Sequence, residues 1–255
     1  MKKSTKIFAL LLSLILLVCA VTLIVGADDA AIEYTYDLAA AVAEAESGST
    51  ITLTGNAKID SAISVDKDLT VDIGNYTVAS SAAVAFTIDD SVSFTIVGSG
   101  DILLDGELFR TGADNSCIVT VSGSAMDDKI EIIHTGAASK YIAYTYNGEF
   151  TYKNLDVLTT YPASTAEYGK AFFHSDMTTA AANVTFDGVE LNVTNATKFN
   201  PGMFAISVCG DSTLTINDSG INTTASGIYL GDLKRENITV DAVSITNSSI
   251  VCGAE

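Results

Sequence analysis

The stretch VTFDGVELNV, residues 184–193, carries the pattern that decides the fold of this chain. Its first half alternates apolar and polar residues, Asp187 and Gly188 form a turn signal, and a second short alternating run follows. Alternation with a period of two is typical of a β-strand that buries one face. The stretch therefore predicts two short strands joined by a turn.

The opening triplet of this stretch, an apolar residue, Thr and a second apolar residue, recurs along the chain. Seven copies begin at residues 69, 94, 119, 150, 184, 214 and 238, and a related eighth copy begins at residue 51. The second place of the seven copies is held by Thr70, Thr95, Thr120, Thr151, Thr185, Thr215 and Thr239. The copies begin 24 to 34 residues apart. A regular recurrence of this length is the signature of a repeat protein.

A third strand-like run precedes many copies, at residues 83–88, 171–175, 204–208 and 227–230. Three short strands per repeat, separated by turns, predict one coil of a right-handed parallel β-helix for each repeat. Helical solenoids need a long amphipathic helix in each unit, and the sequence after residue 50 contains none. The expected fold class is all-β, a right-handed parallel β-helix of about seven or eight coils over residues 51–255.

Residues 28–50 precede the coils and are expected to cap them. Asp37 can cap a helix over residues 38–46, and Gly48 can end it. The apolar stripe of this helix consists of Leu38, Ala41, Val42 and Ala45. At the other end the sequence SIVCGAE, residues 249–255, stops partway through a coil. An open coil exposes a strand edge, so we expect either further coils in a longer protein or a partner that covers this end.

The N-terminus has the features of an export signal. Positive charge in residues 1–6 is followed by an apolar run over residues 7–25, and Val25-Gly26-Ala27 offers a cleavage site. The alternative is an uncleaved membrane anchor, because the run is long enough to cross a bilayer. Residues 1–27 are therefore expected to send the protein to the cell surface or the medium.

The chain is acidic, with a formal charge of −18. Cleavage before Asp28 would remove three lysines and no acidic residue, which lowers this charge by three to −21. Such a chain repels phosphate backbones and anionic lipids, so nucleic acid is not an expected partner. Contact with a membrane is expected only through the N-terminal segment.

The cysteines offer a test of the register. Cys209 and Cys252 both follow a Val and precede a Gly, and Leu230 stands in a similar context halfway between them. These three residues are predicted to share one position in three successive coils. Two coils would separate the cysteines by about 10 Å, which is too far for a disulfide. Cys209 and Cys252 are expected to be free and to face inward, and Cys117 has no evident partner either.

The segment DLAAAVAEAESGSTITL, residues 37–53, followed by ISVDKDLTVDIGNYTV, residues 63–78, carries a family resemblance. Behind an export segment, this order is similar to the start of pectin lyase-like β-helix surface proteins, many of them adhesin-like proteins of bacteria and archaea. The resemblance covers roughly residues 35–250. It implies the β-helix fold, which in such families serves polysaccharide lyases, glycoside hydrolases, esterases, tailspikes and non-catalytic adhesins, so it does not by itself imply an activity.

Enzymes of this fold need residues that the sequence does not offer in a recognisable arrangement. The only arginines, Arg110 and Arg235, lie outside any lyase-like motif, and no Gly-His-Gly element accompanies the Asp pairs. No catalytic residue is therefore predicted. The alternative interpretation is a polysaccharide-active enzyme, a lyase or glycoside hydrolase, or the N-terminal part of one, with its site in later coils or in the loops around residues 134–176.

Aromatic residues concentrate where the repeats are longest. Nine of the 20 Phe and Tyr residues fall between Tyr141 and Phe173. Tyrosines on projecting loops can stack on sugar rings, whereas Phe150, Phe172 and Phe173 are expected to fill a wider core. His174 is a conceivable base or ligand beside Asp176. The candidate ligand-binding residues are Tyr144, Tyr146, Tyr161, Tyr168, His174 and Asp176.

No cofactor is predicted. Two histidines and unpaired cysteines make a zinc site improbable, while NDSG at residues 217–220 and GADN at residues 112–115 offer hard oxygen ligands for Ca²⁺. The sequence favours a non-catalytic adhesin, stalk or envelope component that binds polysaccharide or cell-envelope glycans. A spacer that holds another domain away from the cell is a third interpretation.

Overall fold

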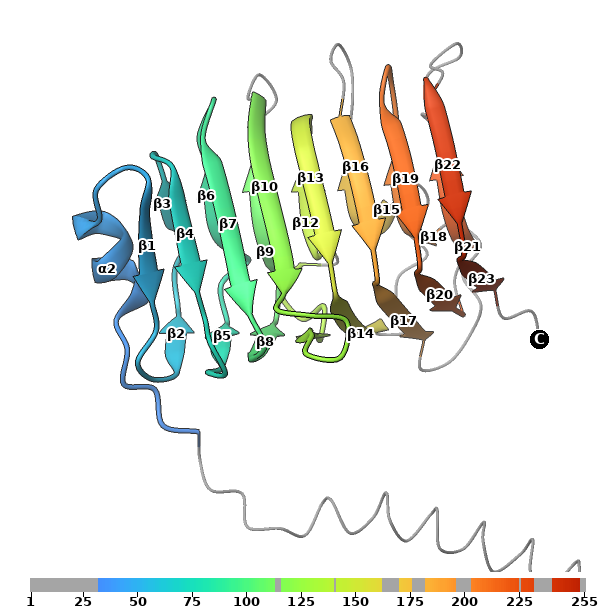
Figure 1. Ribbon diagram of the computed structural model, residues 1–255. Coiled ribbons are helices and arrows are strands. Elements are labelled where there is room, and N and C mark those ends of the chain that lie inside the picture. The colour runs from blue at the N-terminus through green and yellow to red at the C-terminus, as the bar shows by residue number, and fades with distance from the viewer. Residues whose placement is uncertain are drawn as a thin grey trace, which may run out of the picture. The chain divides into compact units, whose positions relative to one another are not determined.

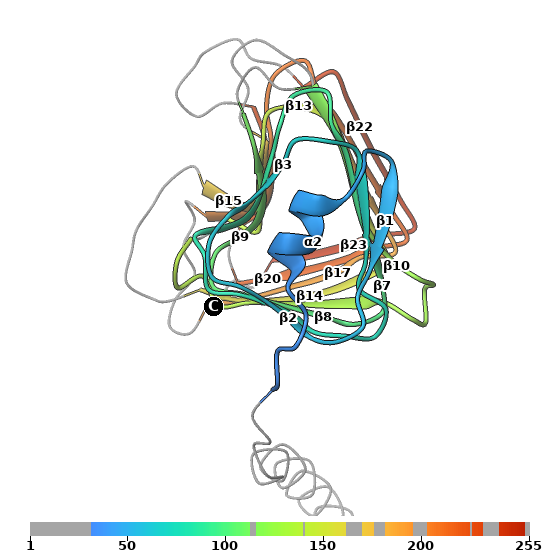
Figure 2. The same cartoon turned by 90° about the vertical axis from the view of Figure 1, so that its left-hand side faces the viewer.

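The computed structural model describes residues 32–112, 116–139, 141–161, 170–175, 182–195, 203–224, 226–231 and 240–252. The chain divides into two units, residues 1–33 and 34–255, and the second contains every described helix and strand. Three parallel sheets in this unit wind as a right-handed β-helix (Figure 1). Figure 2 looks along the rod and shows the three sheets around a common interior. The predicted fold class is confirmed.

Seven coils each contribute one strand to each sheet, and the last described coil contributes β22 and β23 to the first two, so neighbouring strands are three apart in chain order. The first sheet consists of β1 (Ser49–Thr52), β4 (Leu69–Asp72), β7 (Ser93–Gly98), β10 (Ser116–Gly123), β13 (Asn147–Lys153), β16 (Ala182–Asp187), β19 (Thr213–Asn217) and β22 (Ala242–Thr246). The second consists of β2 (Ala57–Ile59), β5 (Val78–Ser80), β8 (Asp101–Leu104), β11 (Ile130–His134), β14 (Leu155–Tyr161), β17 (Glu190–Asn195), β20 (Gly220–Thr223) and β23 (Ser249–Cys252). The third consists of β3 (Ile63–Val65), β6 (Val84–Ile88), β9 (Glu107–Thr111), β12 (Ala143–Thr145), β15 (Lys170–Ser175), β18 (Met203–Val208) and β21 (Ser226–Leu230).

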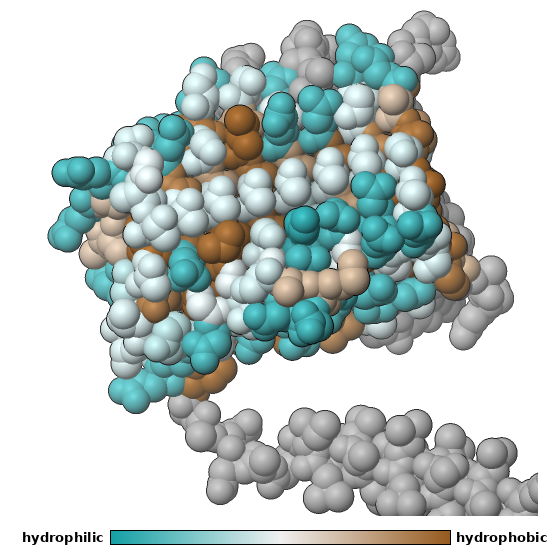
Figure 3. All heavy atoms as spheres, viewed as in Figure 1, coloured by the Kyte–Doolittle hydropathy of each residue, from teal (hydrophilic) through white to brown (hydrophobic). Residues whose placement is uncertain are grey.

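The Thr column of the repeats runs along the outer face of the first sheet. Its paired members are Thr70, Thr95, Thr120, Thr151, Thr185 and Thr215, each opposite the next. Figure 3 shows this face, on which a row of pale side chains follows the rod. The apolar residues on either side of each Thr point inward, so the predicted register is confirmed for six successive copies.

The register of the two terminal copies was predicted wrongly. Thr50, and not Thr52, lies opposite Thr70. A shift of two residues keeps the same face buried, so alternation alone does not choose between the two. In the last coil Ser244, and not Thr239, lies opposite Thr215. The runs ITV and AVSIT both alternate, and Ala242–Thr246, not the run that begins at residue 238, forms the last strand of the first sheet.

Aromatic side chains fill the interior of the long coils. Phe150, Phe172 and Phe173 are all buried, as predicted. Tyr152 lies between Phe173 and Phe186, with ring centroids 4.7 and 4.8 Å away. Each such contact adds about 0.5–1.5 kcal/mol to the stability gained by burying the ring. Burial also raises the pKa of the Tyr152 phenol.

A short helix closes the N-terminal end of the rod. Helix α2 (Leu38–Glu44) begins at Asp37, whose side chain accepts a hydrogen bond from the Ala40 amide at 3.0 Å. Its Leu38 and Val42 side chains are buried against the first coils. At the other end Lys67 Nζ donates to the carbonyl oxygens of two residues, Ala43 and Ala45, both at 3.2 Å. Such contacts satisfy carbonyl groups that the last turn leaves without helical partners. The predicted short capping helix is confirmed (Figure 2), but it ends at Glu44, two residues earlier than predicted, with Ala45 and not Gly48 at its end.

The described residues contain no helix that is both long and apolar enough to span a bilayer. The predicted export segment, residues 1–27, lies outside them.

None of the three cysteines within the described residues forms a disulfide, as expected. Their predicted register is wrong, because Cys252 lies opposite Thr223 in the second sheet, whereas Cys209 follows β18 of the third sheet. A three-residue Val-Cys-Gly match is too short to assign a strand to a sheet. Cys209 is buried, as predicted, and its Sγ donates to the Gly231 carbonyl at 2.8 Å. Cys252 is exposed, so the prediction that it faces inward is wrong.

This arrangement predicts that a single thiol of the rod reacts in the native protein. The thiolate is the reactive form, and burial raises the pKa of the Cys117 thiol to about 12. In the full chain carrying Cys19→Ser, a disulfide reagent at pH 8 should label Cys252 rapidly. Cys117 and Cys209 should react only after unfolding in denaturant. A Cys252→Ser control should lose the rapid phase, and two rapidly reacting thiols would contradict the structure.

Candidate functional site

The outer face of the third sheet carries a column of charged, aromatic and polar side chains in register. Arg110 on β9 lies opposite Tyr144 on β12, which lies opposite His174 on β15. The column continues through Ser207 on β18 to Tyr229 on β21. These residues are far apart in the sequence and lie together because each coil places the same strand position on the same outer face.

Five partly exposed side chains form the centre of this face: Arg110, Tyr141, Tyr144, Tyr146 and His174. We call them the aromatic cluster. The Tyr144 ring lies at its middle, with its centroid 4.8 Å from that of Tyr141 and 5.4 Å from that of Tyr146. His174 lies 5.1 Å from Tyr144 and stacks on Tyr141 at 5.5 Å with an interplanar angle of 25°. Both distances are in the usual range for interacting rings.

Arg110 completes the cluster as a flat cationic group. Its guanidinium carbon lies 5.2 Å from the centroid of the Tyr144 ring, which is the distance of a cation–π contact. On its other side Arg110 Nε donates to Glu107 Oε2 at 2.7 Å, and Nη2 contacts Oε1 of the same carboxylate. This pairing raises the pKa of Arg110. It fixes the guanidinium plane against the rings.

Glu107 is a fully buried carboxylate behind the cluster. Besides the two contacts from Arg110, its Oε1 accepts a hydrogen bond from the Ser139 hydroxyl at 2.8 Å. Burying a charge is costly unless the charge is paired and hydrogen-bonded. The carboxylate therefore depends on Arg110 and on the segment that brings Ser139 to it.

His134 holds that segment in place from inside the rod. Its Nε2 lies 2.9 Å from the Ser139 carbonyl and its Nδ1 lies 2.8 Å from the Thr159 hydroxyl. A carbonyl only accepts, so Nε2 carries the proton and Nδ1 accepts from Thr159. Burial lowers the pKa of His134 to about 4, against the opposing effect of its hydrogen bond to Ser139. His134 is thus a neutral structural residue that supports the chain leading to Tyr141.

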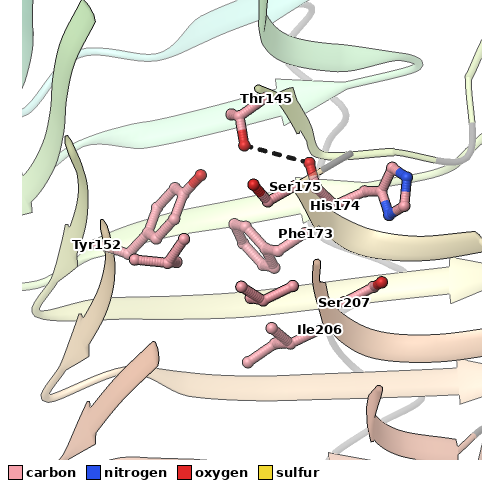
Figure 4. Close-up of a pocket in the computed structure, with 9 residues that line it drawn as sticks. Thr145, Tyr152, Phe173, His174, Ser175, Ile206 and Ser207 are labelled. Carbon is pink, nitrogen blue, oxygen red and sulfur yellow. Dashed lines mark hydrogen bonds between the residues drawn. The ribbon is translucent and has the colours of Figure 1, made fainter. Parts of the chain in front are cut away.

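A small interior space lies beneath the aromatic cluster. Figure 4 shows Tyr152, Phe173 and Ser175 turned toward it, whereas the His174 ring points away from these residues. The Thr145 hydroxyl donates to the His174 carbonyl at 3.3 Å across the neighbouring strands. The cavity measures about 10 Å³, which is room for about one water molecule. A larger ligand must therefore lie on the outer surface, against the rings.

The structure brings together three of the six predicted site residues: Tyr144, Tyr146 and His174. Tyr161 ends β14 and lies opposite Asn195, so its backbone belongs to the second sheet. The Tyr161 side chain, Tyr168 and Asp176 lie outside the described residues.

Sequence reasoning missed Arg110, Tyr141 and the buried Glu107. Arg110 was weighed only as a lyase residue. Arg110 lies at an outward position of the strand LFRT, and an alignment of the coils would have placed it opposite Tyr144. Tyr141 is three residues before Tyr144, a distance at which a bend in the chain can bring two rings together.

A second surface hollow, of about 440 Å³, lies at the corner between the first and second sheets. Acidic side chains line it, and Lys129 within it pairs with Asp156 at 2.8 Å.

Among the described residues no three His, Cys, Asp or Glu side chains are grouped so that they could hold a metal ion. Of the two proposed Ca²⁺ segments, residues 113–115 lie outside the described part. The prediction stays that the protein has no cofactor, with Ca²⁺ as the alternative.

Comparison with known proteins gives no assignment, since no protein-family model and no curated protein matches the chain.

The buried Glu107 predicts an asymmetric response to mutation. Arg110→Met leaves the carboxylate without its cation. We expect a loss of about 2 kcal/mol in the free energy of unfolding, below the usual about 3–5 kcal/mol because water can enter the vacated space. Adding Glu107→Gln should restore more than half of it. Chemical denaturation of the single and double variants measures the coupling. Lys153→Met, which breaks the exposed pair with Asp187, is the control and should cost less than about 1 kcal/mol. Equal losses for Arg110→Met and Lys153→Met would show that Glu107 does not need its partner.

The neutral His134 predicts a stability that falls at acid pH. The unfolded chain binds a proton near pH 6.5 but the folded chain only near pH 4. The unfolded state therefore gains about 3 kcal/mol relative to the folded state as the pH is lowered through this window. In His134→Gln this part of the pH dependence should disappear, whereas His174→Gln should retain it. Denaturation curves at pH 7.5 and pH 4 test this, and an unchanged difference in His134→Gln would refute it.

Proposed function

We propose that this protein is a secreted or cell-surface β-helix that binds carbohydrate without cleaving it, as an adhesin, stalk or envelope component. The aromatic cluster is the observation that carries the proposal. It presents several partly exposed rings side by side on the outer face of a sheet. The C–H groups of a sugar ring carry partial positive charge and pack favourably on the negative face of an aromatic ring.

The support behind the cluster favours binding. Arg110 is held by Glu107, Glu107 by Ser139, and Ser139 by His134. Side chains fixed in this way lose little conformational entropy when a ligand arrives, so more of the contact energy is available for affinity. A surface platform of this kind suits a polymer, which the cavity beneath it is too small to enclose.

The state of Glu107 supports binding without cleavage. Glycoside hydrolysis requires carboxyl groups that reach the scissile bond and exchange protons with it. Glu107, the carboxylate that pairs with the cluster, is fully buried and accepts hydrogen bonds from Arg110 and Ser139. It is placed to hold Arg110 and not to reach a ligand on the surface.

The cellular location in this proposal rests on sequence. Residues 1–27 have the charge and apolar pattern of an export signal. The resemblance of the cap and first coils to adhesin-like, pectin lyase-like surface proteins points in the same direction. The parallel β-helix architecture is consistent with it.

Binding to immobilised polysaccharides tests the proposal. The purified full chain should bind at least one polysaccharide saturably, and Tyr144→Ala should weaken that binding at least about tenfold, since central aromatic residues contribute most to such surfaces. Tyr34→Ala removes an exposed ring next to the cap and should leave the affinity unchanged. Thermal melting should confirm that both variants fold.

Two outcomes would contradict the proposal. The absence of saturable binding to any polysaccharide would remove the carbohydrate function. Binding that is followed by release of shortened or unsaturated oligosaccharides would instead identify an enzyme.

A further inference from the structure

The third sheet carries a second aromatic pair besides the rings of the cluster. Phe204 and Tyr229 lie with ring centroids 4.7 Å apart at an interplanar angle of 35°. The corresponding values for Tyr141 and His174 are 5.5 Å and 25°. All four side chains are partly exposed. We call Tyr141–His174 the first pair and Phe204–Tyr229 the second pair.

The two pairs occupy equivalent positions two coils apart. His174 lies opposite Ser207, and Ser207 lies opposite Tyr229, so Tyr229 is the counterpart of His174. Phe204 lies opposite Ala171. Tyr141 stands three residues before Tyr144 of the column, as Phe204 stands three residues before Ser207. In each pair, an aromatic residue three positions before one column residue stacks on the column residue of the next coil.

The two pairs occupy four successive coils: the first pair spans the coils of β12 and β15, and the second pair spans those of β18 and β21. Ser207 separates His174 from Tyr229 and its side chain is buried. Neighbouring strands in a sheet are about 4.8 Å apart, so the two pairs lie about 10 Å apart along the rod. Equivalent aromatic pairs therefore recur along the face at two strand spacings.

The spacing of the two pairs along the rod matches the repeat of one class of polymer. In an extended β-linked chain of pyranose sugars, each unit is close in length to one strand spacing. Successive units are turned over, so the same face recurs at every second unit. The first pair can then stack on one sugar and the second pair on the next but one. Such a chain would lie parallel to the axis of the rod.

The electrostatics select an uncharged chain. The protein carries a formal charge of −18, so a polyanion is repelled. Arg110, the cation of the cluster, is already paired with the buried carboxylate of Glu107. It serves as a flat partner for Tyr144 and does not offer an unpaired charge to an acidic sugar.

We infer that the third sheet binds a neutral, extended, β-linked polysaccharide along the rod axis, with the two aromatic pairs as stacking sites for alternate sugar units. This inference rests on the proposed carbohydrate-binding function. It assigns the chemical class of the bound polysaccharide and the direction in which the chain lies on the rod.

A length series of neutral β-1,4-linked oligosaccharides tests it by titration calorimetry on the full chain. Affinity should rise about tenfold or more from the disaccharide to the trisaccharide, because the third unit reaches the second pair within one molecule. Tyr229→Ala should abolish this step, so that the disaccharide and the trisaccharide bind with equal affinity, whereas Tyr144→Ala should weaken the binding of both. Tyr229→Leu keeps apolar bulk without the ring, should behave like Tyr229→Ala, and guards against a folding defect. Tyr34→Ala is the matched control for loss of an exposed tyrosine.

The outcomes separate this inference from the function on which it rests. If no polysaccharide binds at all, the proposed function fails and the inference fails with it. If polysaccharide binds but Tyr229→Ala leaves the length dependence intact, or lowers the affinity for every length equally, the arrangement of alternate sites is overturned. Tighter binding of an oligouronate than of the neutral series would overturn the choice of an uncharged chain.

Discussion

In-register parallel pairing is the constraint on which this structure depends. Each coil presents its hydrogen-bonding groups and its apolar residues to the coil before it, and both must match. A side chain in one coil is therefore placed by the coil beneath it. The same requirement that stacks Val119 on Phe94 and Phe150 on Val119 in the interior stacks Tyr144 on Arg110 outside.

The sequence predicted the fold well because in-register pairing requires the same pattern of residue types in each coil. A Thr recurs at the outward position of the first sheet, and its apolar neighbours recur inside, so Thr70 and Thr185 could be aligned without a structure. Prediction failed at the ends, at Thr52 and Thr239. A terminal coil has a neighbour on one side only, and short alternating runs then fit more than one register. For Cys252 the match was only a tripeptide.

The site was predicted in part for the same physical reason. Tyr144, Tyr146 and His174 stood out by type and local density, and they lie together. Glu107 did not stand out, because its meaning comes from Ser139, 32 residues later in the chain. Loops at the corners vary in length from coil to coil. A contact between two coils at a corner therefore produces no periodic pattern in the sequence.

The coils differ in length while their register stays constant, and this has a consequence for how such a protein can change. From Phe94 to Val119 the chain uses 25 residues, and from Phe150 to Val184 it uses 34, yet both pairs of residues lie opposite each other. The added residues are accommodated between the strands. An insertion at a corner can thus be inherited without shifting the outer columns, and a substitution in one column can be inherited without disturbing a corner. The two kinds of variation are independent, so selection can alter the length of a loop and the chemistry of a face separately in the same gene.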